Sequence, residues 1–287
     1  MAITLAVLSS ICFGIALVTG RVGLRTLNAR AGAAISIPTA TVLFLLAAPF
    51  ALNTSDFSAR AGIIFAVVGL FFPAVVTLLT FRSNEQLGPT ITSTVSCTAP
   101  LFALVAAGLL LGERIPARAA VAAVGVVAGI ALLSWNPGAV RRPFPRASLM
   151  WPIAGAVVRG LAQVAAKAGL QLWPNPFAAG LIGYIVSSGT VVGTDRLRSG
   201  DRQAPSKRSI AWFALTGALN GGAVLLMYAA LSIAPVSLVA PVVAAYPLVT
   251  VLVSAVTLHD ERLDLKRFLG AAITVAAIVY LVSSRAG

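Results

Sequence analysis

Charged, redox-active and metal-binding side chains are scarce in this sequence. Only 10% of its 287 residues are charged, and it contains two cysteines, one histidine and eight acidic residues. Soluble chains ordinarily carry about 25% charged residues. No group of His, Cys, Asp and Glu has metal-ligand spacing, no glycine-rich phosphate loop joins a strand to a helix, and no Ser/His/Asp set lies within reach of a membrane. We therefore predict no cofactor, no bound metal and no enzymatic activity.

Apolar residues dominate instead. They make up 59% of the chain, and the mean hydropathy is +0.95. Because a helix needs about 20 apolar residues to cross a bilayer, windows with few charges identify the spans. Ten spans follow, near 2–19, 33–52, 61–81, 89–111, 118–135, 149–170, 177–194, 210–231, 236–258 and 268–284. We predict an all-α, multi-pass protein with ten transmembrane helices in the cell membrane, the inner or plasma membrane of a bacterium.

The second half of the sequence repeats the first. Ala-Pro-Leu at 99–101 and Tyr-Pro-Leu at 246–248 each precede a long apolar run that closes on Glu-Arg. An offset near 146 residues pairs Gly14 with Gly160, Arg21 with Lys167, Pro89 with Pro235, Pro100 with Pro247, and Glu113 with Glu261. We interpret the chain as two five-helix units, 1–136 and 149–287, joined by a Pro- and Arg-rich linker at 137–148.

An odd number of helices in each unit implies that the second unit enters the membrane from the opposite side. The basic residues agree, because 15 of them fall in the odd-numbered connections and 4 on the other side. By the positive-inside rule the odd connections are cytoplasmic and both termini face outward. The basic loops also suit anionic membrane lipid as a partner, and we predict no nucleic-acid partner.

Paired, proline-broken helices indicate a transporter site at the bilayer midplane. Pro100 and Pro247 form such a pair, and each removes a backbone hydrogen bond near the middle of its span. Polar side chains gather close by in the sequence: Ser93, Thr94 and Cys97, then Tyr246 and Thr250, then Asn220 and Tyr228. We predict that these residues bind substrate; the alternative is hydrogen bonding between helices and mild kinking.

One helical face in the second unit carries charge. Arg159, Gln163 and Lys167 recur every four residues and so share a face. A charged side chain at mid-span costs about 2.5–3.5 kcal/mol on insertion scales and must meet a partner or water. No mid-membrane carboxylate is available to Arg159, since the nearest acidic residue at the membrane edge is Glu85. We predict that Arg159 and Gln163 bind an anionic substrate group such as a carboxylate; a structural link to backbone carbonyls is the alternative.

Two further features have simpler interpretations. His259, the only histidine, follows the ninth span, where a solvated loop residue is expected more than a pH switch. Gly125 and Gly129 form a Gly-x-x-x-Gly pattern that allows close helix approach, either within the chain or in a homodimer. We favour the contact within the chain.

The repeated block, with Pro100-Leu101, an apolar run, Gly112-Glu113-Arg114 and a Gly-rich helix, resembles the EamA repeat of the drug/metabolite transporter superfamily. The resemblance implies a ten-helix secondary transporter whose cavity is lined by helices 1–4 and 6–9, with helices 5 and 10 supporting the bundle. Relatives often have Trp-Gly in the first helix of each unit. Here Phe13-Gly14 and Arg159-Gly160 take those places, which adds Phe13 to the candidate site and disfavours a hydrophobic or cationic ligand. Relatives are usually drawn with cytoplasmic termini, in contrast to the charge count.

Together these features predict an exporter that moves a small organic solute, an amino acid or another carboxylate-bearing metabolite, by alternating access. With no Asp or Glu inside the expected spans, exchange or facilitated movement is favoured over proton coupling. A carrier for lipophilic drugs or cations and a non-transporting membrane scaffold are the alternatives.

Overall fold

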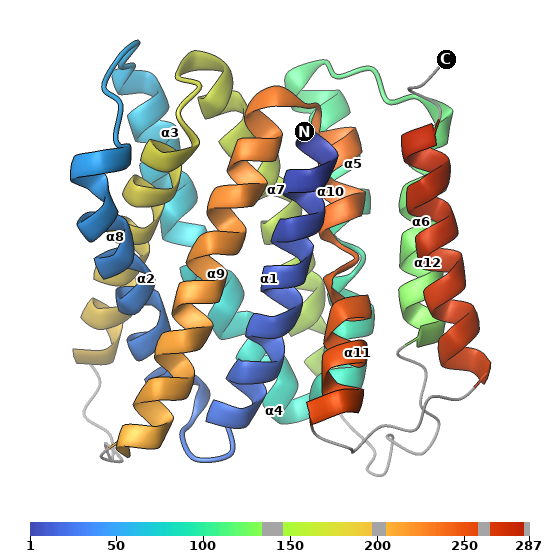
Figure 1. Cartoon of the computed structure of the whole chain (residues 1–287), viewed down its shortest axis with the longest axis horizontal. Coiled ribbons are helices and arrows are strands. Elements are labelled where there is room, and N and C mark those ends of the chain that lie inside the picture. The colour runs from blue at the N-terminus through green and yellow to red at the C-terminus, as the bar shows by residue number, and fades with distance from the viewer. Residues whose placement is uncertain (134–145, 197–204, 258–264, 284–287) are drawn as a thin grey trace.

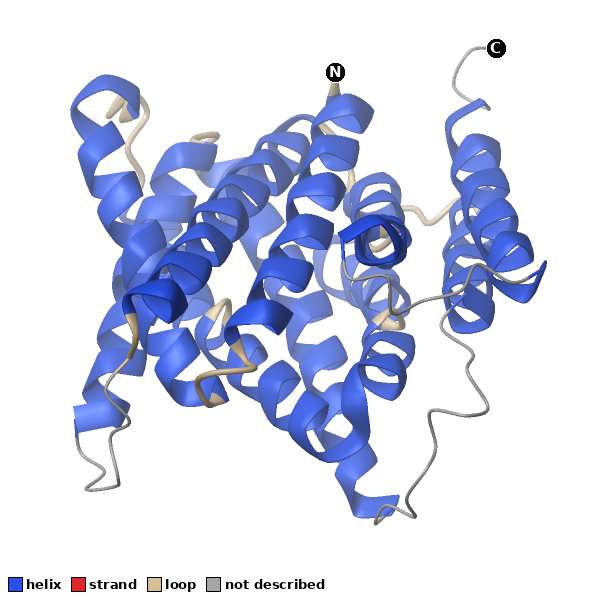
Figure 2. Ribbon diagram, turned by 60° about the horizontal axis from the view of Figure 1, so that its bottom comes forward, coloured by secondary structure: helices blue, strands red, loops and turns tan. Residues whose placement is uncertain are grey.

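The computed structural model describes residues 1–133, 146–196, 205–257 and 265–283, and these residues form only helices and the turns between them (Figures 1 and 2). In chain order the helices are α1 (Ala2–Gly23), α2 (Ala29–Ala51), α3 (Ala59–Phe71), α4 (Ala74–Ser96), α5 (Ala99–Leu111), α6 (Ala117–Leu133), the short 3-10 helix η2 (Arg146–Leu149), α7 (Met150–Leu172), α8 (Pro176–Arg196), α9 (Lys207–Ile233), α10 (Val236–Val243), α11 (Tyr246–Thr257) and α12 (Leu265–Ser283). The expected helical class is confirmed for these residues.

The helices form a multi-pass membrane bundle. In the described part of the chain, seven segments are long and apolar enough to cross a membrane by length and composition, and three apolar helices, Ala99–Leu111, Ala117–Leu133 and Phe268–Ser283, are shorter. Large apolar side chains such as Leu46, Leu109 and Val256 point outward. Outward apolar surface of this kind suits contact with lipid chains.

Helix breaks occur at matching places in the two halves. The chain turns at Cys97–Thr98 before α5 and at Ala244–Ala245 before α11. In each turn an N–H bonds three residues back, from Thr98 to Val95 O at 3.1 Å and from Ala245 to Val242 O at 3.2 Å. Pro100 and Pro247 stand second in the helices that follow, where the missing N–H costs least. The predicted pair of proline-broken helices is confirmed.

The span expected at 61–81 differs in the structure. It is divided at Phe72–Pro73, between α3 and α4, because a proline disfavours helical geometry in the residue before it and lacks an N–H of its own. The connection expected at 82–88 instead lies inside α4. Polar residues by themselves do not end a helix, so their appearance after an apolar run was a poor boundary signal.

The two halves run in opposite directions. In Figure 1, α1 descends from the edge where the chain begins, α7 ascends toward it, and α12 ends at that same edge. We call this edge the terminal face and the opposite edge, which holds the α1–α2 turn and the start of α9, the basic face. The α1–α2 turn, which contains Arg25, and the start of α9, which contains Lys207 and Arg208, lie at the basic face (Figure 1). The start of α3, which contains Arg60, and the α5–α6 turn, which contains Arg114, lie at the terminal face. The two-sided charge pattern read from the sequence therefore follows the observed helix directions.

Helices α6 and α12 pair beside the main bundle (Figures 1 and 2). A Cβ atom added at Gly129 would lie 2.7 Å from the Thr274 backbone N and 2.8 Å from Gly270 O, and one at Gly125 would lie 2.9 Å from the Ala277 Cβ. Backbones approach this closely only where side chains are absent. The predicted use of the Gly-x-x-x-Gly pattern within the chain is confirmed.

Candidate functional site

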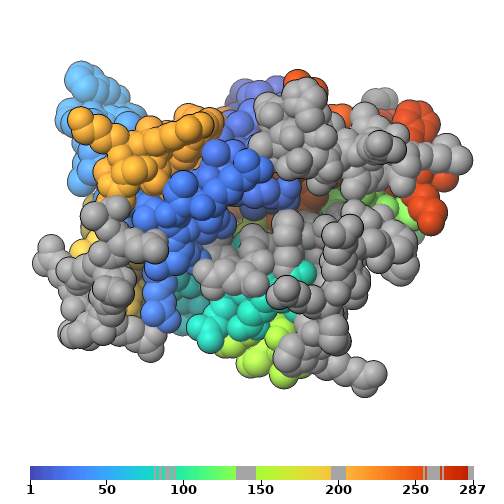
Figure 3. Space-filling view, turned by 90° about the horizontal axis from the view of Figure 1, so that it is seen from below, coloured from blue at the N-terminus to red at the C-terminus, as the bar shows by residue number. Residues whose placement is uncertain are grey.

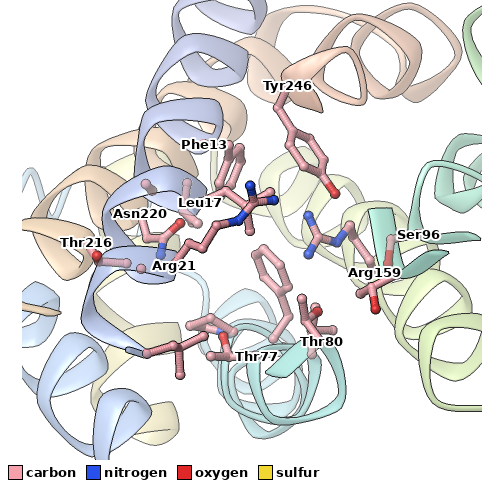
Figure 4. Close-up of a pocket in the computed structure, with 18 of the residues that line it drawn as sticks. Phe13, Leu17, Arg21, Thr77, Thr80, Ser96, Arg159, Thr216, Asn220 and Tyr246 are labelled. Carbon is pink, nitrogen blue, oxygen red and sulfur yellow. The ribbon is translucent and has the colours of Figure 1, made fainter. Parts of the chain in front are cut away.

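A cavity of about 380 Å³ lies between the two halves. Figure 4 shows its walls, which come from helices of both repeats. The lining residues are Phe13, Ala16, Leu17, Gly20, Arg21, Leu24, Leu27, Asn28, Phe72, Pro73, Val76, Thr77, Thr80, Thr92, Ser96, Arg159, Tyr184, Thr216, Asn220, Val224 and Tyr246. None of these residues belongs to α6 or α12. The absence of α6 and α12 from this lining set agrees with the supporting role that the family resemblance implies for them, but α2, which the resemblance expects to line the cavity, contributes no residue to the set either.

Two arginines give the cavity its charge. Arg159 enters from α7 and Arg21 from α1, and both guanidinium groups point into the cavity (Figure 4). The Arg159 guanidinium carbon lies 5.6 Å from the centre of the Tyr246 ring, within cation–π range. No acidic residue appears among the described residues that line the cavity. Two cationic side chains and no described acidic one therefore face the cavity.

Two glycines hold Phe13 and Arg159 at the cavity wall. A Cβ atom at Gly160 would lie 2.9 Å from Ala99 O at the start of α5, and one at Gly14 would lie 2.8 Å from Tyr246 O at the start of α11. Each first helix of a unit therefore packs directly on the helix break of the other unit. The residues before these glycines, Phe13 and Arg159, both lie near Tyr246: the Phe13 and Tyr246 rings are 6.3 Å apart, and the Arg159 guanidinium lies over the Tyr246 ring.

The structure separates the predicted site residues into three groups. Phe13, Arg159, Asn220 and Tyr246 line the cavity; Gln163, Cys97, Pro100, Tyr228, Pro247 and Thr250 do not; and the side chains of Ser93 and Thr94 lie outside the described part, as does His259. Cys97 packs with Val126 and Ile130 of α6. Thr250 donates to Tyr246 O at 3.1 Å and Gly14 O at 3.2 Å, so it supports the α11 break.

Gln163 and Lys167 lie on the same face of α7 as Arg159, but neither of them lines the cavity. Gln163 is buried, and its side-chain oxygen has no partner among the described residues. Lys167 reaches the end of α9, where its ammonium group donates to Leu231 O at 2.6 Å and Ala234 O at 3.0 Å. A charged side chain here satisfies carbonyls that the end of a helix leaves open.

Glu113 binds the α10 side of the α9–α10 turn, whose α9 side Lys167 contacts. Gly112 ends α5 in the left-handed region, with φ 63°, and Glu113 follows it. The Glu113 carboxylate accepts hydrogen bonds from the backbone N–H groups of Val236 and Ser237, at 3.1 and 3.0 Å, and from the Ser237 hydroxyl. These groups begin α10, so the carboxylate satisfies open donors and the positive helix end. We call Glu113 and Lys167, with the α9–α10 turn between them, the turn clamp.

The cavity reaches one face of the bundle. Leu24, Leu27 and Asn28 of the α1–α2 turn line it, and Figure 3 shows this turn between α9 and α4 on the basic face. None of its described lining residues comes from the turn clamp or from the turns at 52–58 and 112–116. The described lining therefore extends to the basic face and not to the terminal face, which we call the closed side.

Sequence reasoning missed several lining residues, including Arg21, Asn28, Thr77, Thr80 and Thr216. Arg21 had a signal, because the repeat places it over Lys167, an intramembrane cation. The threonines had none, since a hydroxyl in an apolar helix is equally suited to bonding its own backbone. Thr216, for example, also donates to Trp212 O at 2.8 Å.

Comparisons with known proteins agree with this architecture. The family model described as the EamA-like transporter family matches residues 1–135 and again residues 146–283. No curated protein matches the sequence. A solved crystal structure, described only as that of a protein, superposes with a TM-score of 0.81 at 15% identity, covering 99% of this chain and 96% of its own. At that identity the likeness shows the fold alone.

Proposed function

The chain belongs to the EamA-like transporter family, and from its cavity we propose that it is a secondary carrier for a small carboxylate-bearing metabolite. Ten spans in two inverted units, 1–136 and 149–287, would enclose the solute at their interface and export it by alternating access. The observation that supports the substrate class is Arg159, a cationic side chain that lines a cavity in which no described residue is acidic. A carboxylate supplies the missing charge and fits the guanidinium fork.

Alternating access is supported by the unequal ends of the cavity. It reaches the basic face, while the turn clamp lies on the closed side. The breaks before α5 and α11 give each unit a joint next to the cavity, and inverted-repeat carriers rock their halves about such a site. The expected spans contain no Asp or Glu, and on that ground we propose exchange or facilitated movement as the mode. Glu85 lies within α4, so flux that depends on a proton gradient would replace this mode with proton coupling.

Ligand-dependent thermal stability of the purified protein tests the substrate class. Amino acids, organic anions, sugars and lipophilic cations should be compared, because a ligand that binds only the folded state raises stability by about 2.7 kcal/mol at a hundred times its Kd. We expect stabilisation by carboxylates, and saturable carboxylate flux in proteoliposomes. Stabilisation by cations alone would favour the drug-carrier alternative. A failure of every compound, with no flux, would favour a scaffold.

Membrane orientation follows from the charge pattern. We propose that the basic face is cytoplasmic, in the plasma membrane of a bacterium, and that anionic lipid binds there. The two native cysteines, Cys12 and Cys97, can be replaced by alanine. A membrane-impermeant maleimide is then expected to label Thr54→Cys at the exposed terminal face of intact cells, and to label Lys207→Cys at the basic face only after lysis. The reverse pattern would contradict this orientation.

A further inference from the structure

We propose that Gln163 and Lys167 of α7 form a second subsite for the solute's carboxylate, on the terminal side of Arg159. The proposal rests on the carrier function above and extends it, because neither residue lines the cavity in this structure. Its starting observation concerns α1 and α7, the first helices of the two units. They have equivalent faces in the repeat, and the α1 face lines the cavity over several turns.

The cavity-lining face of α1 forms a continuous stripe. Residues three and four apart lie on one face of a helix, and α1 runs toward the basic face (Figure 1). The stripe therefore follows the cavity from the Tyr246 ring to the basic face. Its members recur at this spacing and are Phe13, Ala16, Leu17, Gly20, Arg21 and Leu24. We call them the α1 stripe.

The repeat places an equivalent stripe on α7. The offset near 146 residues maps the α1 stripe onto the face that holds Arg159, Gln163 and Lys167. Because α7 runs toward the terminal face (Figure 1), this α7 stripe leads from the cavity to the closed side. With a rise of about 1.5 Å per residue, Lys167 lies about 12 Å beyond Arg159 along the helix axis.

Opening to the other side exchanges the roles of the two stripes. Inverted repeats are related by an axis in the membrane plane, and alternating access rocks one repeat against the other around a fixed site. The state open to the terminal face is therefore equivalent to the present state with the two units exchanged. In that state the α7 stripe lines the path, as the α1 stripe does here.

The buried amide of Gln163 has an unused acceptor within the described part of the chain. Its side chain is 5% exposed, and its Oε1 atom has no hydrogen-bond partner there. Buried polar atoms are normally hydrogen-bonded, and an open path would supply water or solute to this one. The equivalent residue of the first unit is Leu17, so the helix packing of the fold does not by itself require an amide at this position.

Lys167 supplies the positive charge at the far end of the α7 stripe. Its ammonium group donates to Leu231 O at 2.6 Å and Ala234 O at 3.0 Å in the turn clamp. Glu113 of the first unit binds the other side of that turn, so opening the closed side separates Glu113 from it. The ammonium can then exchange a neutral carbonyl for the solute's carboxylate, because a charged acceptor makes the stronger hydrogen bond.

Sided thiol labelling of the full-length protein in membranes tests the path. In the cysteine-free background above, Gln163→Cys is treated with sulfonatoethyl methanethiosulfonate, a small impermeant anion. We expect labelling from the side that labels Thr54→Cys. Labelling should be at least about fivefold faster with Glu113→Gln in the turn clamp, since one lost hydrogen bond shifts a population by this much. The matched control is Val164→Cys, a buried neighbour off the stripe that should stay unlabelled.

The charge of Lys167 is tested with the charge of the reagent. Ala166→Cys stands next to Lys167 on the stripe, at the position that Gly20 has in α1. The anionic reagent should label it at least about tenfold faster than the trimethylammonium analogue, after both rates are normalised to Thr54→Cys, because a cationic path concentrates anions. Lys167→Gln should remove most of this preference. Arg60→Gln, an exposed change at the terminal face, should leave it intact.

The outcomes separate the subsite from the carrier function. Labelling of Gln163→Cys from the basic face only, from neither face, or no faster than Val164→Cys would overturn the path. An unchanged anion preference in Lys167→Gln would overturn the binding role of the ammonium. If Gln163→Cys does not fold, Ala166→Cys decides the path by the same criteria. Failure of the carboxylate assignment would instead leave the sided labelling intact, with no stabilisation or flux for any carboxylate.

Discussion

Replacing Arg159 by glutamine is expected to weaken carboxylate binding by about 30-fold to several thousand-fold. Glutamine keeps much of the side-chain length but removes the charge that faces the cavity. Losing one partner of an enclosed, hydrogen-bonded charge pair costs about 2–5 kcal/mol, and each 1.4 kcal/mol is about tenfold in affinity. The measurement is calorimetric affinity for the carboxylate that stabilises the wild-type protein best.

Two further variants test whether the loss of affinity is due to the charge and shape of the Arg159 side chain. Arg159→Lys keeps a cation without the planar fork, so its affinity should fall between those of the wild type and Arg159→Gln. Arg114→Gln removes an exposed arginine at the terminal face and should leave affinity unchanged. Unaltered carboxylate affinity in Arg159→Gln would contradict the assigned role and leave Arg159 as a structural partner of Tyr246.

Replacing Glu113 by glutamine is expected to lower the free energy of unfolding by about 1–3 kcal/mol and to reduce flux at least about tenfold. The carboxylate accepts hydrogen bonds from Val236 N and Ser237 N at the start of α10. An amide has a single acceptor oxygen and no charge, so at least one of these donors loses its partner, and the penalty for that is of this size. Flux should fall because the closed side of the cavity depends on this turn. Chemical unfolding in detergent and proteoliposome uptake measure the two effects.

The neighbouring residue supplies the control. Arg114→Gln changes a charge one position along, in an exposed place, and should shift stability by less than about 0.5 kcal/mol. Glu113 and Lys167 hold the same turn, so Glu113→Gln combined with Lys167→Met should deviate from additivity by more than about 0.5 kcal/mol. Equal effects of Glu113→Gln and Arg114→Gln would show that the turn clamp contributes nothing.

Much of the fold follows from local properties of the sequence. Pro100 and Pro247 mark helix breaks because proline lacks a backbone donor wherever it stands. Gly125 and Gly129 indicate close packing because no side chain separates the backbones there. The excess of basic residues on one side predicts which connections share a face. In contrast, the helix break at Phe72–Pro73 was not predicted, because the proline stands inside a continuous apolar run. The connection predicted at 82–88 was wrong, because its polar residues were interpreted as a turn although they lie within α4.

The candidate site depends on which helices lie next to one another in the fold, and the sequence alone does not give those contacts. By itself the sequence determined a membrane bundle of two related halves and singled out Arg159, since a charge in an apolar span demands a partner. Only the tertiary structure decided that Arg21 enters the same cavity while its repeat counterpart Lys167 joins Glu113 across the α9–α10 turn. Equivalent positions in a repeat have the same helical setting but different neighbours, and those neighbours decide whether a cation meets a cavity or a backbone carbonyl.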